Sequence, residues 1–128
     1  MAPAQINLMN IESYNLSYFK AIALSGIVDD SQLPQLRQLC LNMLRAEEKS
    51  FIMDMSRVIK VSRKVLELFS DVAKKLNLLN GKLLIMNMNP QIFQKIKTGM
   101  NIDPNLGYFA NEMEASRYIE SSREYYCF

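Results

Sequence analysis

The chain alternates short apolar segments with segments whose apolar residues recur at helical spacing, and this alternation predicts an α/β fold. The clearest strand is Phe51–Met55, a brief apolar run bounded by polar residues. The clearest helix follows it, with apolar residues at 65, 66, 68, 69, 72, 73 and 76. Because parallel strands are joined by helical crossovers, we expect a mainly parallel sheet of four to five strands with about four helices packed on it.

The first part of the chain predicts two strands and one helix. Gln5–Met9 is expected to form a short opening strand, and Ser17–Leu24 a longer one with strand-prone side chains. Gly26 and the polar cluster at 29–31 are expected to end that strand and begin a helix. The helix carries one apolar stripe that should face the sheet, formed by Leu33, Leu36, Cys40, Met43 and Leu44.

The central helix has clear signals at both of its ends. After the strand Phe51–Met55, residues 58–61 are expected to lead the chain across to Ser62. Ser62 stands where an N-cap belongs, because its hydroxyl can accept a hydrogen bond from a backbone N–H of the first turn. The pair Asn80-Gly81 marks the other end of the helix.

The last part of the chain repeats the alternation. Lys82–Met88 is a further apolar strand, Pro90 opens a short helix, and Leu106–Ala110 is expected to be the last strand. Asn111 should cap a final helix, with acidic residues favourably placed near its positive end. We expect one domain over residues 1–128, with a core at about 15–120 and an aromatic C-terminal tail that packs, pairs with another chain or frays.

The composition disfavours several kinds of protein. A net charge of +2, with basic residues spread along the chain, gives no electrostatic footprint for a nucleic acid. The start of the chain lacks a basic region followed by an apolar core, and no run of eighteen apolar residues occurs. We therefore expect a cytoplasmic protein that does not bind nucleic acid and does not insert directly into a membrane.

The residues that usually carry catalysis are scarce. The chain contains no histidine, which removes the commonest general base and the commonest transition-metal ligand. Its four glycines are isolated from one another, so no phosphate-binding loop can be built from them. Cys40 and Cys127 have neither the number of a disulfide framework nor the spacing of a metal site. We expect no enzymatic activity, no metal and no cofactor.

Two short motifs, taken in order, carry a resemblance to a known family. The segment 21–29 ends in Gly26-Ile27-Val28-Asp29, and the segment 54–58 reads Asp-Met-Ser-Arg-Val. Together with the strand at 81–88, the Thr98-Gly99-Met100 step and Ala115 in the last helix, they resemble the STAS domain of bacterial anti-sigma factor antagonists. The resemblance covers roughly residues 15–120, and its specificity comes from the order and spacing of the motifs.

This resemblance implies a binding protein that is regulated by phosphorylation. In the family, a serine or threonine at the start of the second helix is phosphorylated by the partner, an anti-sigma factor that is also a serine kinase. The sequence departs from that pattern, because an alignment without gaps places Ser62 on the family's aspartate and Arg63 and Lys64 on its two hydroxyl positions. A shift of two residues would make Ser62 the phosphoacceptor. The alternative is that Ser62 only caps the helix.

Basic residues surround Ser62. Arg63 and Lys64 stand at a helix start, where the helix dipole disfavours cations, and Arg57 and Lys60 extend the basic stretch. We expect Arg57, Lys60, Arg63 and Lys64 to form one patch that binds an acidic partner surface or a phosphate. A solvated loop without a partner is the alternative. Asp29 is expected at the same edge of the sheet, in the interface or as a cap of the first helix.

The sequence therefore predicts an anti-sigma factor antagonist-like protein in a partner-switching pathway. The runner-up is a STAS subunit that no kinase switches, such as the small component of a lipid-trafficking ABC transporter or a signalling scaffold. A homodimer is an open alternative for the assembly.

Overall fold

The structure is a computed structural model that describes residues 9–99 and 106–126 of the chain. Strands and helices alternate along it, as the sequence predicts. The strands are β1 (Asn10–Leu16), β2 (Phe19–Val28), β3 (Ser50–Val61), β4 (Lys82–Met86) and β5 (Leu106–Phe109). The helices are a short 3₁₀ turn η1 (Asp30–Gln32), α1 (Leu33–Arg45), α2 (Arg63–Leu78), α3 (Pro90–Gly99) and α4 (Glu112–Tyr126).

The strands form one sheet in the order β1-β2-β3-β4-β5. β1 and β2 form an antiparallel hairpin with Leu16 opposite Phe19, and the two residues between them turn the chain, with Ser17 at a φ of 57°. The other three neighbouring pairs are parallel. The predicted mainly parallel α/β fold is confirmed, and within the described residues it has five strands and four α-helices.

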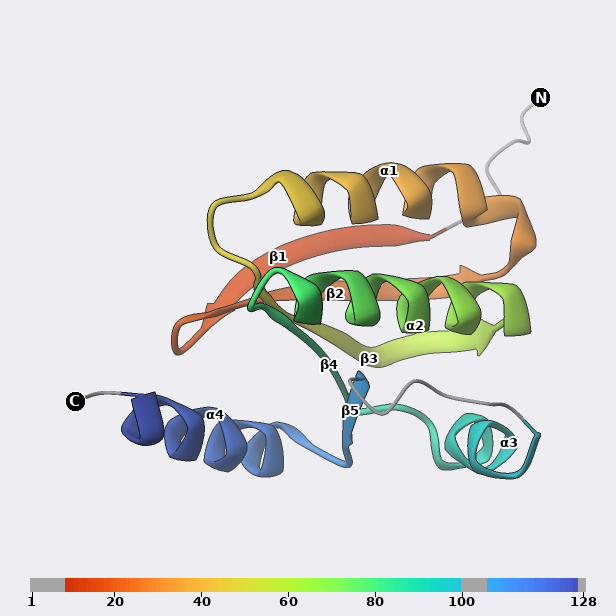
Figure 1. Cartoon of the computed structure of the whole chain (residues 1–128). Helices are drawn as coiled ribbons and strands as arrows, with labels where there is room; N and C mark the ends of the chain where they lie inside the picture. The colour runs from red at the N-terminus through yellow and green to blue at the C-terminus, as the bar shows by residue number, and fades with distance from the viewer. Residues whose placement is uncertain (1–8, 100–105, 127–128) are drawn as a thin grey trace.

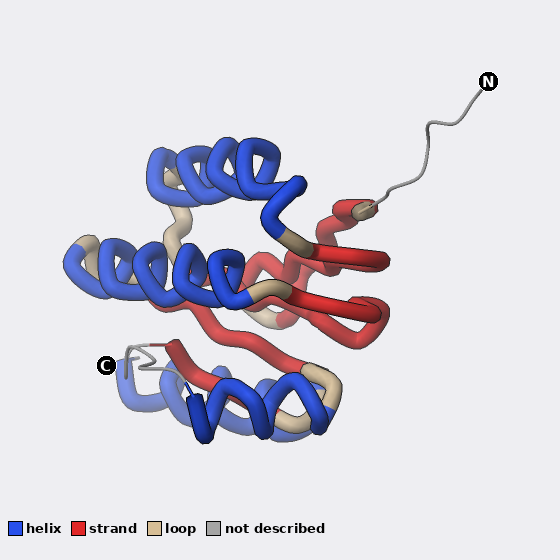
Figure 2. Tube along the Cα trace, turned by 90° about the vertical axis from the view of Figure 1, so that its right-hand side faces the viewer, coloured by secondary structure: helices blue, strands red, loops and turns tan. Residues whose placement is uncertain are grey.

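Helices cover both faces of the sheet. Figure 1 shows α1 and α2 side by side over one face, and α4 under the other; Figure 2 gives the same layers from the side. The larger apolar cluster lies between the sheet and the α1–α2 layer. The smaller one lies between the sheet and α4, where Ala115 and Ile119 are fully buried. Cys40 lies in the larger cluster, which confirms that it is a core residue.

β3 extends well beyond its neighbour β4. The pairing of these two strands ends at Asp54 and Met86, so that residues 55–61 pair with β2 alone. This overhanging part contains two irregularities, between Ala23 and Ser25 and between Gly26 and Ile27, where β3 has one extra residue each time. Gly26 has a φ of 92°, which glycine adopts readily. Bulges of this kind increase the local twist of a strand.

Several predicted boundaries were wrong. The first strand within the described residues begins at Asn10, whereas a strand was expected at Gln5–Met9. Of that segment only Met9 is described, and it lies outside the strand; the rest lies outside the described residues. Residues 58–61, expected to be a connection, are part of β3. Gly26 does not end β2, because the strand continues to Val28 opposite a bulge in β3.

The last helix also differs from its expected extent. α4 continues to Tyr126, so the first three residues of the expected tail, 124–126, are helical. Cys127 and Phe128 lie outside the described residues.

Candidate functional site

Ser62 joins the end of β3 directly to the start of α2. Its hydroxyl oxygen accepts a hydrogen bond from the backbone N–H of Val65 at 3.4 Å, and its carbonyl accepts one from Leu66 at 3.2 Å. Its own N–H donates to the carbonyl of Val28 at 3.0 Å, which holds the helix start against the end of β2. The predicted N-cap is confirmed, and Ser62 is half-buried in this role.

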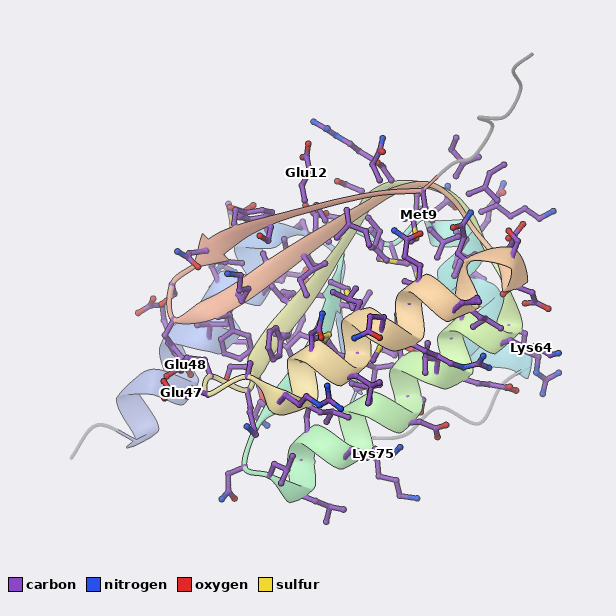
Figure 3. All side chains as sticks on the ribbon, turned by 90° about the horizontal axis from the view of Figure 1, so that it is seen from above. Met9, Glu12, Glu47, Glu48, Lys64 and Lys75 are labelled. Atoms are coloured by element: carbon purple, nitrogen blue, oxygen red, sulfur yellow. The ribbon has the colours of Figure 1, made fainter. Side chains whose placement is uncertain are left out.

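Two cations occupy the first turn of α2. Arg63 is paired with Glu67 one turn later at 3.2 Å, and both side chains are largely exposed, so the pair contributes little to stability. Figure 3 shows Lys64 projecting from this end of the helix, far from Glu47 and Glu48 at the opposite end of the sheet. The first turn of α2 has no acidic residue. The helix dipole therefore adds to the positive potential of these two side chains.

Asp29 lies next to this helix start, because its neighbour Val28 bonds to Ser62. Its carboxylate accepts hydrogen bonds from the hydroxyl of Ser31 at 2.6 Å and from the backbone N–H of Ser31 at 3.0 Å. These two bonds, and the nearby charge of Lys60, hold the pKa of Asp29 below its usual range. Asp29 thus caps the 3₁₀ turn that precedes α1, and it stays ionised.

Lys60 and Arg57 lie on the overhang of β3. Lys60 is opposite Ile27 and Arg57 is opposite Ser25 on β2. The two residues are three positions apart, which is roughly 10 Å along a strand. The structure therefore brings Asp29, Lys60 and the start of α2 together at the carboxyl edge of β2 and β3, while Arg57 lies further back along the strand.

A hydrogen-bond network around Asp54 is a feature that the sequence did not reveal. The carboxylate of Asp54 accepts bonds from the hydroxyl of Tyr14 at 2.9 Å, from the amide of Asn87 at 3.1 Å and from the backbone N–H of Ser56 at 3.0 Å. Burial by itself raises the pKa of Asp54, but the bonds from Asn87, Ser56 and Tyr14 outweigh it and keep the pKa below its usual range.

The Asp54 network joins distant parts of the sheet. Tyr14 comes from β1, Asp54 from β3 and Asn87 from the residue after β4, so three segments converge on one carboxylate. Asn87 adopts a left-handed backbone, with a φ of 63°, which asparagine tolerates better than most residues. One feature of the sequence could have indicated this network: Asp54 stands inside an apolar strand, and a partly buried carboxylate needs hydrogen-bond partners.

Three further observations concern the Cys40 thiol, metal sites and membrane spans. Burial raises the pKa of the Cys40 thiol to about 12 against the opposing charge of Lys75, so this thiol remains protonated and unreactive. Among residues 9–99 and 106–126, no three histidine, cysteine, aspartate or glutamate side chains are grouped to hold a metal. Within the same residues, no helix is long and apolar enough to cross a membrane.

The strand order and the two helical layers define a small α/β domain, and comparison with known proteins identifies its family. The family model of the STAS domain matches residues 10–115, and the chain therefore belongs to the STAS domain family. A search of curated proteins found no match.

Three solved structures show the same fold at low sequence identity. The anti-sigma factor antagonist SpoIIAA in its unphosphorylated form is 16% identical, with a TM-score of 0.64, and the match covers 87% of this chain and 98% of that one. SpoIIAA of Bacillus in its phosphorylated form is 16% identical, with a TM-score of 0.63 and coverage of 86% and 99%. A STAS domain protein from Planctomyces limnophilus is 14% identical, with a TM-score of 0.71 and coverage of 86% and 97%.

Proposed function

We propose that this chain is an anti-sigma factor antagonist-like regulator, which binds an anti-sigma factor that is also a serine kinase in a cytoplasmic partner-switching pathway. The single observation that carries the proposal is the exposed, positively charged start of α2 beside Asp29, in a chain that belongs to the STAS family. Capture of the anti-sigma factor by this surface releases the sigma factor. The role is one of binding and requires no catalysis by this chain.

The charge distribution supports an acidic surface on the partner. Lys60 and Lys64 are exposed, and Lys64 has the helix dipole behind it. Exposed charges of this kind speed up association and select the partner, more than they add to affinity. Arg63 joins the surface when its weak pair with Glu67 opens, and Asp29 contributes its carboxylate at the border. Arg57 extends the surface along the overhang of β3.

Ser62 is the residue on which a kinase would act in this proposal. A phosphate on this residue would add about two negative charges at a helix N-terminus, where the dipole and Lys64 stabilise them. The same charges would cancel the positive surface that the acidic partner recognises. Phosphorylation therefore switches binding off while the helix itself stays intact.

A second function has one observation in its favour. Ser62 is half-buried and engaged as the cap of α2, and the two helix positions after it are Arg63 and Lys64 rather than hydroxyl residues. This arrangement suits a STAS subunit that no kinase switches, such as a small component of a lipid-trafficking ABC transporter or a scaffold. Such a subunit would use the same surface for permanent assembly, or would pair with a second copy of itself.

The test is capture of the tagged chain's partners from its native lysate, followed by mass spectrometry. Alongside the wild type, a K60E/K64E variant reverses one charge at the end of β3 and one in the first turn of α2. A K74E/K75E variant reverses two charges near the other end of α2. Recovery of a kinase-like anti-sigma factor by the wild type and by K74E/K75E, but not by K60E/K64E, supports the proposal. Recovery of a permease and an ATPase without a kinase favours the second function.

A further inference from the structure

A pocket lies at the carboxyl ends of β4 and β5, beside the overhang of β3. It encloses about 430 Å³, within the range of sites that hold small molecules. Its lining comes from β3, from the segment after β4, from the first turn of α3 and from the end of β5. The lining residues are Ser56, Asn87, Met88, Asn89, Pro90, Phe93, Tyr108, Phe109 and Ala110. None of the residues assigned above to partner binding is among them.

The lining is aromatic and uncharged. Phe93 and Tyr108 pack edge to face with their ring centroids 5.8 Å apart, and Phe109 adds a third ring. Met88 and Pro90 complete the apolar part. Among the lining residues that the structure describes, no side chain is charged. The hydrogen-bond network next to the pocket is centred on the anionic Asp54, which Ser56 and Asn87 contact. Such a site favours a flat, uncharged molecule and rejects an anion.

The Tyr108 hydroxyl is the polar group that this pocket leaves without a partner. Its oxygen is buried, and within the part of the chain that the structure describes it is the one buried side-chain polar atom without a hydrogen bond. Burial raises the pKa of Tyr108 to about 12, so the hydroxyl remains a hydrogen-bond donor at neutral pH. A buried hydroxyl without a hydrogen bond lowers stability, and a phenylalanine would keep the ring contacts without that loss. The hydroxyl at this position therefore indicates a hydrogen-bond partner from outside the chain.

Three other polar side chains of the lining each make a hydrogen bond within the chain. The amide nitrogen of Asn87 donates to Asp54 at 3.1 Å, and the side-chain oxygen of Asn89 accepts a bond from the backbone N–H of Gln91 at 2.8 Å. The Ser56 hydroxyl also hydrogen-bonds to Asp54. The buried Tyr108 oxygen makes no such bond, so we assign the orienting contact to it.

We propose that this pocket binds a small uncharged aromatic molecule that carries one hydrogen-bond acceptor. The ligand ring packs against Phe93 and Phe109, and its acceptor receives the hydroxyl of Tyr108. Because the hydroxyl oxygen is buried, the ligand reaches it once the side chains that cover it move aside. Binding of a small molecule would thus take place next to β3, the strand that leads to Ser62.

The experiment is a titration of the isotope-labelled full chain with small-molecule probes, in which binding is measured by NMR as changes in the amide chemical shifts. Three probes separate the ligand properties: acetophenone is uncharged and carries an acceptor, isopropylbenzene has a similar shape without one, and benzoate is an anion. We expect saturable shifts at Asn87, Phe109 and Ala110 with the two neutral probes, tighter binding of acetophenone, and no binding of benzoate. Absence of saturable shifts with acetophenone would overturn the proposal, as would shifts confined to another surface.

Two variants and one control test the assigned contacts. The variant Y108F should weaken acetophenone binding roughly threefold to tenfold, the worth of one hydrogen bond, and leave isopropylbenzene unaffected. The variant A110W fills the mouth of the pocket from an exposed position and should abolish binding of both. The control Y118F removes a hydroxyl outside the pocket and should change neither. Equal acetophenone affinities of Y108F and wild type would overturn the role of the hydroxyl.

Discussion

The hydroxyl of Tyr14 donates a hydrogen bond of 2.9 Å to the carboxylate of Asp54, although the two residues are 40 positions apart and β2 lies between their strands. The bond crosses β2 where it carries small side chains, since Ala21 is opposite Tyr14 and Ala23 is opposite Asp54. Asp54 in turn holds Asn87 after β4. The edge strand is thereby tied to the centre of the sheet, next to the overhang that leads to the candidate site.

The variants Y14F and D54N should be destabilised and should be coupled. Loss of the Tyr14 hydroxyl is expected to lower the free energy of unfolding by about 1 kcal/mol, and loss of the Asp54 charge by about 1–3 kcal/mol. The double variant should be less destabilised than the sum of the two, because both remove the same bond. Urea denaturation of the four proteins measures this, and strict additivity would contradict the coupling.

The stability of the protein should fall on acidification in a way that depends on Asp54. The native pKa of this carboxyl lies below its usual range, because the hydrogen bonds that it accepts outweigh its burial. The unfolded chain therefore takes up the proton first as the pH falls below about 5, and the contribution of Asp54 disappears as the pH approaches its native pKa. The wild type should lose more stability than D54N between pH 6 and the acid limit of folding. If the free energies of unfolding of the two proteins fell in parallel with pH, the lowered pKa of Asp54 would be contradicted.

Replacement of Ser62 separates its capping role from any role in signalling. The variant S62A should lower the free energy of unfolding by about 1 kcal/mol, since the bond to the Val65 N–H is lost. The variant S62D restores a capping oxygen, so its stability should be close to that of the wild type. If S62D nevertheless loses the partner, the negative charge is what the partner rejects. An S62A protein as stable as the wild type would show that the cap contributes nothing.

The variant Y108F should be more stable than the wild type in the absence of a ligand. It removes a buried hydroxyl that has no partner and keeps the ring against Phe93. A gain of about 1 kcal/mol in the free energy of unfolding is expected. Urea denaturation without added probes measures it, with Y118F as the matched control. A destabilised Y108F would indicate that the hydroxyl is bound within the chain.

The features of this structure that depend on residues close together in the sequence could be predicted from it. The N-cap at Ser62 is set by a hydroxyl and a backbone N–H three residues later, and the inward faces of α1 and α2 follow from the spacing of their apolar residues. The fold class followed from the alternation of such segments.

The features that depend on residues far apart in the sequence could not be predicted. The bond between Tyr14 and Asp54 exists only once β1 is paired with β2, and the first strand is largely exposed, so it lacks the apolar alternation that marks a half-buried strand. Residues 58–61, expected to be a connection, are strand because they pair with the end of β2, beyond the last residue that pairs with β4. The pocket around Tyr108 is assembled from three separate segments, and no single segment contains its signal.

The central claim is that the start of α2 is the surface that recognises the partner. The most direct measurement is the affinity of the captured partner, purified, for the wild type, K60E/K64E and K74E/K75E by titration calorimetry. The account predicts that K60E/K64E binds about tenfold more weakly and that K74E/K75E binds like the wild type. Equal affinities of the wild type and K60E/K64E, with both proteins folded, would contradict it.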